Sequence, residues 1–229
     1  MAAGSFRRYI VYGNMTLQIL LILLSYIVGA CPFGLLIART KGIDIRTVGS
    51  GNIGATNVLR TVGKAAGICV FALDAAKGFV PAILFPFLMA RQFVGNIDLT
   101  VMGLLCGVSA IIGHNYPVYL GFKGGKGVAT SGGVVIGLAP AAAGIGFLAW
   151  IAMLLVTGYV SIASMGAGVA VAVAAWTLYG GHSLLLPVVF SFLAALIIWK
   201  HRANIERLRR GEEHRILTFR RITGREEKV

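Results

Sequence analysis

Residues 17–38 read LQILLILLSYIVGACPFGLLIA and contain no charged side chain. A helix that crosses the hydrocarbon of a bilayer needs about 20 apolar residues, so this stretch predicts a transmembrane helix. Similar, mainly apolar runs cover 65–90, 97–113, 141–157, 159–179 and 183–200. The chain as a whole is 57% hydrophobic and 13% charged, and its mean hydropathy is +0.83. These patterns predict an all-α polytopic membrane protein, with residues 1–229 forming a single integral membrane domain.

The basic residues outside these runs predict how the chain is oriented. Of the 21 Lys and Arg residues, five fall within 39–64, two within 114–127 and ten from Lys200 onward. Because the cytoplasmic loops of membrane proteins are enriched in Lys and Arg, all three segments are expected in the cytoplasm. This places the N-terminus outside, together with a polar N-terminal extension, 1–14. Residues 214–229 then form a basic cytoplasmic tail.

The number of helices follows from the same assignment. Since both the 114–127 segment and the tail are expected inside, an even number of helices must connect them. The breaks between these helices are expected at Pro140, Gly158 and Gly180–Gly181. This gives seven transmembrane helices, of which the fourth, over 127–139, is short. Arg7 and Arg8 oppose the orientation, because they fall on the predicted outer side; five basic residues in the first loop outweigh these two.

A glycine-rich turn follows the first apolar run, where residues 49–60 read GSGNIGATNVLR. It contains the GxGxxG spacing of dinucleotide-binding folds, and Asp74 follows at about the expected 20 residues. That interpretation requires a soluble βαβ unit, whereas Asp74 lies in an apolar run, so it is rejected. The candidate phosphate-binding side chains of the turn are Ser50, Asn52, Asn57 and Arg60. An arginine can bind two phosphate oxygens at once; a solvated turn at the membrane interface is the alternative.

A second polar loop, residues 114–127, reads HNYPVYLGFKGGKG. Glycines let backbone N–H groups approach a phosphate, two lysines neutralise it, and a helix starting at Val128 adds the positive end of its dipole. The loop is not a Walker A motif, because Gly127 replaces the Ser or Thr that binds magnesium, and nucleotide hydrolysis is not expected. Attraction of the lysines to anionic lipid is the alternative. The candidate residues are His114, Lys123, Gly124, Gly125, Lys126 and Gly127.

A third polar segment, residues 201–213, follows the last apolar run and reads HRANIERLRRGEE. If it is helical, His201 and Asn204 lie on one face, three positions apart. A basic segment that only holds the membrane surface is the alternative.

Two charged residues, Asp74 and Lys77, lie inside the second apolar run. A charge at mid-helix costs about 2.5 to 3.5 kcal/mol on insertion scales, so buried charges usually face a cavity or each other. Two interpretations remain open. Either the pair neutralises itself, or Lys77 reaches toward the cytoplasmic anion site.

Together and in this order, the three motifs resemble those of the bacterial acyl-phosphate-dependent glycerol-3-phosphate acyltransferase family. The resemblance runs from about Tyr26 to Glu213. It rests on Gly49–Asn52, Gly54–Asn57 and Arg60, on Gly113–His114 through Pro117 with Phe122–Gly127, and on His201–Arg202, Asn204–Ile205, Arg207–Leu208, Gly211 and Glu213. It implies transfer of a fatty acyl group from acyl phosphate to the 1-hydroxyl of sn-glycerol 3-phosphate, giving lysophosphatidic acid and phosphate. This is the first step of phospholipid synthesis, at the cytoplasmic face of the bacterial inner membrane.

The resemblance also implies roles for individual residues. The expected catalytic residues are Ser50, Arg60, His114, His201 and Asn204. The expected substrate-binding residues of the motifs are Asn52, Asn57, Lys123, Gly124, Gly125, Lys126 and Gly127. Lys77, outside the motifs, is added to them on the interpretation in which it reaches toward the anion site. Glu213 is expected to organise arginine side chains, and His114 to cap or polarise its loop. Either His201 or a substrate phosphate oxygen accepts the hydroxyl proton. A covalent role for Ser50 is disfavoured, since the donor is already activated.

The expected partners are fatty acyl phosphate, glycerol 3-phosphate and membrane lipid, with no nucleic acid and no cofactor. No metal is expected, because the few acids form no carboxylate cluster suited to Mg²⁺ and the three cysteines form no CxxC pair. The lack of clustered aspartates also argues against a CDP-alcohol phosphotransferase. A transporter of a phosphorylated solute is disfavoured, because its site would lie near the midplane. An acyltransferase with an H-x4-D pair is disfavoured too, since His201 and Glu206 lie on different helix faces.

Overall fold

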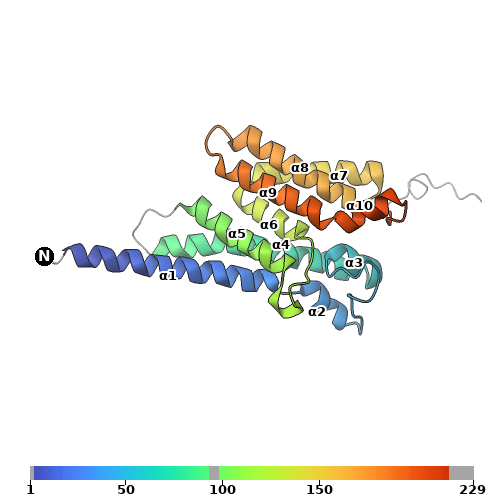
Figure 1. The fold of residues 1–229 in the computed structure, drawn as a ribbon, viewed down its shortest axis with the longest axis horizontal. Helices are drawn as coiled ribbons and strands as arrows, with labels where there is room; N and C mark the ends of the chain where they lie inside the picture. The colour runs from blue at the N-terminus through green and yellow to red at the C-terminus, as the bar shows by residue number, and fades with distance from the viewer. Residues whose placement is uncertain (1–2, 93–97, 217–229) are drawn as a thin grey trace, which may run out of the picture. The chain divides into compact units, whose positions relative to one another are not determined.

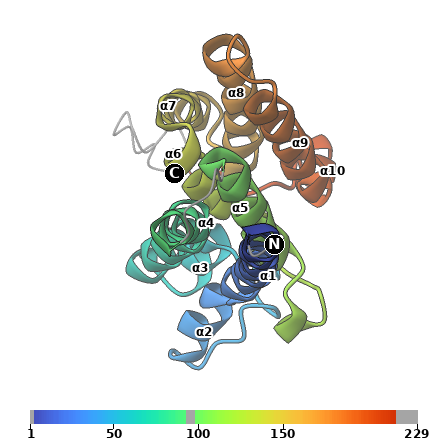
Figure 2. The same ribbon diagram turned by 90° about the vertical axis from the view of Figure 1, so that its left-hand side faces the viewer.

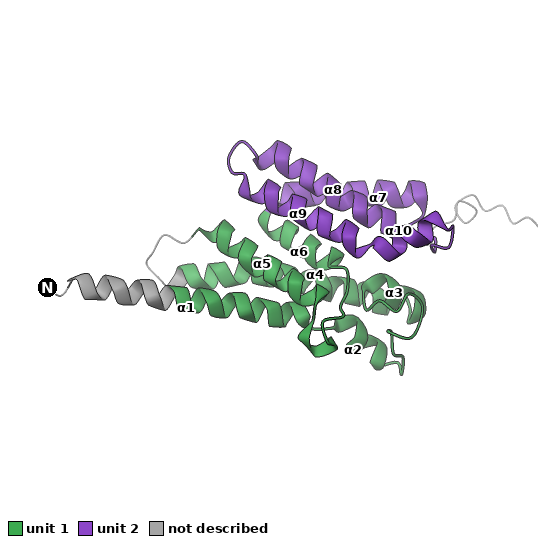
Figure 3. Cartoon of the chain, in the orientation of Figure 1, with its two compact units in different colours: residues 1–138 green, residues 139–229 purple. Residues whose placement is uncertain are grey.

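The computed structural model describes residues 3–92 and 98–216, with side chains described within 15–90 and 98–216. Every regular element in these ranges is a helix, which confirms the all-α prediction. The chain divides into two compact units, Met1–Leu138 and Ala139–Val229 (Figure 3). Two predicted segments lie partly outside the described residues: the side chains of the extension 1–14, and the part of the tail 214–229 from residue 217 onward.

Unit 1 is built around one long central helix, α4. The unit contains α1 (Ala3–Ala30), α2 (Phe33–Arg39), α3 (Ala55–Thr61), α4 (Lys64–Gln92), α5 (Leu99–Asn115), η1 (Val118–Leu120) and α6 (Val128–Leu138). Helix α4 packs against α1, α2, α3, α5 and α6, and α5 also packs against α1 and α6 (Figures 1 and 2). Phe85 and Met89 of α4 meet Met102 and Cys106 of α5 in a buried cluster, to which α1 adds partly buried apolar side chains.

Glycines let the helices of unit 1 approach to backbone contact. A methyl group on Gly78 of α4 would collide with the carbonyl of Thr130 in α6, and one on Gly133 of α6 with the carbonyl of Ala75 in α4. Gly29 of α1 lies in the same way against a carbonyl of α5. Within a membrane, where lipid removes most of the hydrophobic driving force between helices, such close contacts supply much of the packing energy.

Unit 2 contains α7 (Pro140–Thr157), α8 (Val160–Tyr179), α9 (Leu185–Lys200) and α10 (Arg202–Arg209). Helix α8 packs against both α7 and α9 (Figure 1). Pro140 is the first residue of α7, and Gly158 ends that helix in the left-handed conformation, with φ of 74°. Helix α8 ends before Gly180. The breaks predicted at these positions are therefore confirmed.

Within the described residues, the helices are long and apolar enough for five membrane crossings, and for six if the bent pair α9 and α10 forms one. The five candidate spans are Met15–Arg39, Lys64–Ala90, Leu99–Leu120, Pro140–Thr157 and Val160–Tyr179. Helix α6, with 11 residues, is shorter than a full crossing and takes the place of the predicted short fourth helix. The seven-span arrangement and its orientation stay predictions.

Candidate functional site

The amide of Asn57 holds the glycine-rich turn of unit 1 in shape. This side chain, 3% exposed on α3, donates hydrogen bonds to the carbonyls of Ile45 (3.2 Å), Val48 (3.1 Å) and Asn52 (2.9 Å). Its Oδ1 accepts a hydrogen bond from the backbone N–H of Ser50 at 3.0 Å. All of these partners are in the turn or the few residues before it, so Asn57 fixes the backbone that presents the exposed Ser50. A substrate contact of Asn57 stays a prediction.

The turn also depends on two glycines with positive φ. Gly49 and Gly51 have φ of 58° and 66°, a conformation that only glycine adopts without strain. A methyl group on Gly49 would collide with the Asn57 side chain. The side chain of Asn52 accepts a hydrogen bond from the N–H of Gly54 at 2.9 Å, just before α3 begins. Arg60 lies half-buried in the last turn of α3, so the same short helix carries both Asn57 and Arg60.

The second glycine-rich loop rests on the C-terminal end of α5. The N–H of Gly125 donates a hydrogen bond to the carbonyl of His114 at 3.1 Å. A methyl group on Gly125 would enter the His114 ring, and one on Gly127, whose φ is 78°, would collide with the Asn115 amide. His114 and Asn115 are both buried. The loop backbone can therefore follow this path only because its residues are glycines.

The two lysines of this loop differ in exposure. Lys123 is exposed, whereas Lys126 is half-buried and engaged in polar contact. Helix α6 begins at Val128, as predicted, so the loop leads directly into a helix N-terminus. Leu120, within the 114–127 loop, packs against the apolar cluster that contains Ile53 of the first turn. The two glycine-rich motifs of unit 1 consequently lie at the same end of that unit.

A buried charge cluster lies behind the second loop. Asp74 and Lys77 of α4 form an ion pair at 2.8 Å, and Asp74 Oδ1 lies 3.7 Å from Nδ1 of His114. Lys77 Nζ also donates a hydrogen bond of 2.8 Å to the carbonyl of Cys31 and lies 5.5 Å from the centre of the Phe33 ring. These are the contacts expected of mutual neutralisation. An interaction of Lys77 with a substrate anion stays a prediction.

In unit 2, the carboxylate of Glu213 accepts hydrogen bonds from three side chains. Its carboxylate accepts from Ser161 Oγ at 3.0 Å, from Asn204 Nδ2 at 2.7 Å and from Arg207 Nε at 2.8 Å. Burial raises the pKa of Glu213, but the hydrogen bonds from Asn204, Arg207 and Ser161 outweigh it, so the pKa lies below its ordinary value. The carboxylate thus fixes the amide of Asn204 and ties α10 to α8.

His201 lies at the bend between α9 and α10, where the helix axes differ by 52°. Its buried ring places Nδ1 at 2.8 Å from the carbonyl of Ile197. Because a carbonyl only accepts, Nδ1 carries the proton, and in the neutral ring Nε2 is the acceptor. The backbone N–H of Asn204 donates to the carbonyl of His201 at 2.8 Å, so the two predicted residues belong to one helical turn.

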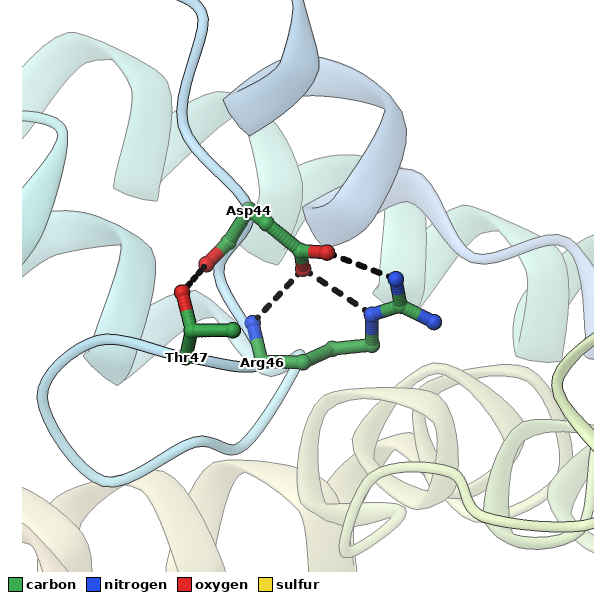
Figure 4. A network of polar contacts seen from close by, with 3 residues as sticks. All are labelled: Asp44, Arg46 and Thr47. Atoms are coloured by element: carbon green, nitrogen blue, oxygen red, sulfur yellow. Dashed lines mark hydrogen bonds and ion pairs between the residues drawn. The ribbon is translucent and has the colours of Figure 1, made fainter.

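Two polar groups of the structure were missed by sequence reasoning. Ser161 lies 52 positions from Glu213, and nothing in the local sequence indicates that they pair. The other group precedes the first glycine-rich turn, where the carboxylate of Asp44 accepts from Arg46 Nε at 2.9 Å and Nη2 at 2.6 Å (Figure 4). Thr47 Oγ1 donates to the carbonyl of Asp44 at 3.0 Å. The Arg46 hydrogen bonds hold the pKa of Asp44 well below its usual range. The Asp-x-Arg spacing is the signal that points to this pair.

These features define the class of the protein. It is a helical membrane protein with glycine-rich, basic turns of the kind that bind phosphate groups. The predicted residues of motifs 49–60 and 114–127 belong to unit 1, and those of 201–213 to unit 2. The family model for glycerol-3-phosphate acyltransferase matches residues 19–211. The chain therefore belongs to the glycerol-3-phosphate acyltransferase family, an integral membrane enzyme family.

Individual relatives match over most of their length. The glycerol-3-phosphate acyltransferase of Aquifex aeolicus is 43% identical over 85% of this chain and 97% of its own. That of Erythrobacter litoralis is 46% identical over 85% and 92% of the two chains. Among solved structures, the integral membrane glycerol 3-phosphate acyltransferase PlsY in its glycerol 3-phosphate form matches with a TM-score of 0.78 and 40% identity, over 90% of this chain and 98% of that one. Its lysophosphatidic acid form matches with a TM-score of 0.76 and 38% identity, over the same shares.

Proposed function

We propose that this protein transfers an acyl group from a fatty acyl phosphate to the 1-hydroxyl of sn-glycerol 3-phosphate, giving lysophosphatidic acid and inorganic phosphate. The observation that carries the proposal is the match to PlsY in its glycerol 3-phosphate form, at 40% identity over 90% of the chain. The second PlsY structure holds lysophosphatidic acid, which is the product that the proposed reaction requires.

The chemistry of the motifs supports the same reaction. Both substrates carry a phosphate, and negative charge develops as the acyl phosphate loses its phosphate group, so cationic side chains and backbone N–H groups stabilise the transition state. The proposed phosphate-binding groups are Arg60, Lys126 and the backbone N–H groups of residues 124–127. Ser50 is proposed to bind phosphate as well. His201 and Asn204 are proposed to position glycerol 3-phosphate.

The proposed chemical step needs orientation more than activation. The 1-hydroxyl oxygen attacks the carbonyl carbon of the acyl phosphate, the bond from that carbon to the phosphate oxygen breaks, and inorganic phosphate leaves. Because this donor is already activated, holding the two groups in contact supplies most of the rate enhancement. The hydroxyl proton goes either to Nε2 of His201 or to a phosphate oxygen of a substrate.

We further propose that the enzyme spans the bacterial inner membrane seven times, with the N-terminus outside and the active site in the cytoplasm. The uneven distribution of basic residues supports this orientation. The glycine-rich turn 49–60 and the loop 114–127 lie at one end of unit 1, where Leu120 packs against the cluster that contains Ile53. This common position also supports the proposed orientation.

The decisive experiment incubates the purified protein with acyl phosphate and glycerol 3-phosphate and measures phosphate release. We expect release to require both substrates and to proceed without coenzyme A and with EDTA present. Arg60→Gln should reduce kcat/KM by about 100-fold, because one phosphate-binding guanidinium is worth about 2 to 3 kcal/mol. Lys64→Gln removes an exposed charge four positions away and serves as the control. Activity with acyl-CoA but not with acyl phosphate would overturn the donor assignment.

A further inference from the structure

A cavity of about 580 Å³ lies in unit 1 where α1 is followed by α2. This volume falls within the range of roughly 300 to 1,000 Å³ found for ligand sites in proteins. The lining includes four large apolar residues, Ile27, Leu35, Leu36 and Leu120. It also includes two arginines, Arg39 and Arg46. The cavity is therefore amphipathic.

The charge at this cavity is positive. Arg46 uses Nε and Nη2 to bind Asp44, and its remaining terminal nitrogen points away from that carboxylate (Figure 4). The side chain of Arg39, the last residue of α2, makes no hydrogen bond or ion pair with any residue in the described ranges, although its charge contributes to lowering the pKa of Asp44. Asp44 therefore balances one of the two guanidinium groups and leaves a net charge of +1. An anion would supply the missing partner.

Apolar residues of the cavity lining are exposed to the surroundings of the helices. Ile27 and Leu36, which belong to the candidate span Met15–Arg39, are 43% and 46% exposed. Tyr119 lines the cavity as well and is 57% exposed. Aromatic rings with a polar end favour the headgroup level of a bilayer. The cavity thus offers apolar residues to an acyl chain and arginines to a phosphate of one lipid.

We propose that this cavity binds an anionic membrane phospholipid, with its phosphate on Arg39 and Arg46 and its acyl chain along Ile27 and Leu36. The lipid is a bound neighbour from the bilayer and not a reactant. None of the residues assigned to the transferred acyl phosphate or to glycerol 3-phosphate lines the cavity. The proposal therefore does not depend on the proposed reaction.

The test measures lipid binding to the full-length, delipidated protein in detergent by native mass spectrometry. Dioleoyl phosphatidylglycerol and the zwitterionic dioleoyl phosphatidylcholine are titrated separately. We expect the first phosphatidylglycerol molecule to bind about tenfold more tightly than phosphatidylcholine. Arg39→Gln should abolish this preference. Lys41→Gln removes another exposed charge, two positions away, that does not line the cavity, and it should leave the preference within about twofold of the unchanged protein.

A second variant guards against a folding defect. Leu36→Trp fills space at the apolar lining residues without changing charge, and it should weaken the binding of phosphatidylglycerol at unchanged thermal stability. Equal binding of the two lipids to the unchanged protein would overturn the proposal. So would a loss of the phosphatidylglycerol preference in Lys41→Gln as large as that in Arg39→Gln. One-for-one displacement of phosphatidylglycerol by acyl phosphate or lysophosphatidic acid, together with a raised KM of Arg39→Gln for acyl phosphate, would assign the cavity to a substrate instead.

Discussion

Glu213 has the most complete hydrogen-bond environment among the described carboxylates of unit 2. Three donors from two helices converge on it, and its side chain is 4% exposed. A buried carboxylate is costly unless it is paired and hydrogen-bonded, and here Arg207 supplies the charge. The arrangement fixes the amide of Asn204, so a change at Glu213 should affect both folding and substrate positioning.

We expect Glu213→Gln to lower the free energy of unfolding at pH 7 by about 1 to 3 kcal/mol, since Arg207 loses its counter-ion. The pKa of Glu213 in the folded protein lies below its ordinary value of 4.5. Its contribution to stability is therefore full above pH 4.5 and is lost as the pH falls through the folded-state value. Thermal unfolding in detergent should show a difference between the two proteins that shrinks on acidification.

Glu206→Gln is the matched control for this prediction. Glu206 pairs with Arg210 at 2.8 Å, but both side chains are at least half exposed, at 50% and 62%. Such exposed pairs contribute about 0 to 1 kcal/mol. An equal loss of stability in the two variants would show that the buried Glu213 pair contributes no more to the free energy of unfolding than the exposed Glu206 pair.

Two substitutions test whether the ring of His201 acts as the general base. If Nε2 accepts the hydroxyl proton, both His201→Ala and His201→Gln should lower kcat by about 100- to 10,000-fold at saturating substrates. If a substrate phosphate oxygen accepts it, His201→Gln should keep most of kcat. Near-normal turnover of either variant excludes His201 as the general base.

At the scale of helices, the close approach of α4 and α6 connects packing to the site. Helix α6 begins directly after the Lys126 loop, and Gly133 lies against the carbonyl of Ala75 in α4. A side chain at this position separates the two backbones. Because the loop is anchored to the start of α6, separation of the helices should also displace the loop.

Two adjacent glycines of α6 allow a matched test. Gly133→Ala should cost about 1 to 3 kcal/mol, because the added methyl group meets backbone that cannot move aside cheaply. Gly132→Ala meets nothing within 4 Å and should be neutral or stabilising by up to about 1 kcal/mol, since alanine favours a helix over glycine. Melting temperatures in detergent measure the first effect, and KM for glycerol 3-phosphate measures any displacement of the loop. Equal behaviour of the two variants would contradict the close-packing argument.

At the scale of the whole molecule, one contact at the end of unit 2 bears on the proposed crossing pattern. In unit 2, the N–H of Ile216 donates to the carbonyl of Gly158 at 2.9 Å, so the turn after α7 and the start of the tail lie at one end. In the proposed topology both are cytoplasmic. The turn between α8 and α9, around His182, is then external.

Cysteine labelling tests this topology. In a background without Cys31, Cys69 and Cys106, which are free thiols, Lys41→Cys and His182→Cys are exposed to a membrane-impermeant maleimide. In intact cells we expect His182→Cys to react and Lys41→Cys to react only after the membrane is opened. The reverse pattern would invert the orientation, and reaction of both in intact cells would contradict the proposed number of crossings.

The sequence predicts best where a single residue restricts the backbone. Pro140 and Gly158 were expected to separate helices and do so, because proline ends a preceding helix and glycine adopts the left-handed cap. Long-range pairing is different: no local pattern links Ser161 to Glu213. The structural role of Asn57 is likewise not visible in the sequence: its amide bonds the backbone of the turn and of the residues just before it, while a substrate contact stays a prediction. A side chain's partner is decided by the folded chain around it.

The ion pair between Asp74 and Lys77 bears on how the chain enters the bilayer during synthesis. Both charges belong to α4, three positions apart, so the helix carries its own counter-ion into the hydrocarbon. The insertion cost of each charge, about 2.5 to 3.5 kcal/mol on its own, is offset before any later helix has been made. His114 joins the pair only after α5 emerges. Helix α4 is therefore able to insert behind α1 without waiting for its final neighbours.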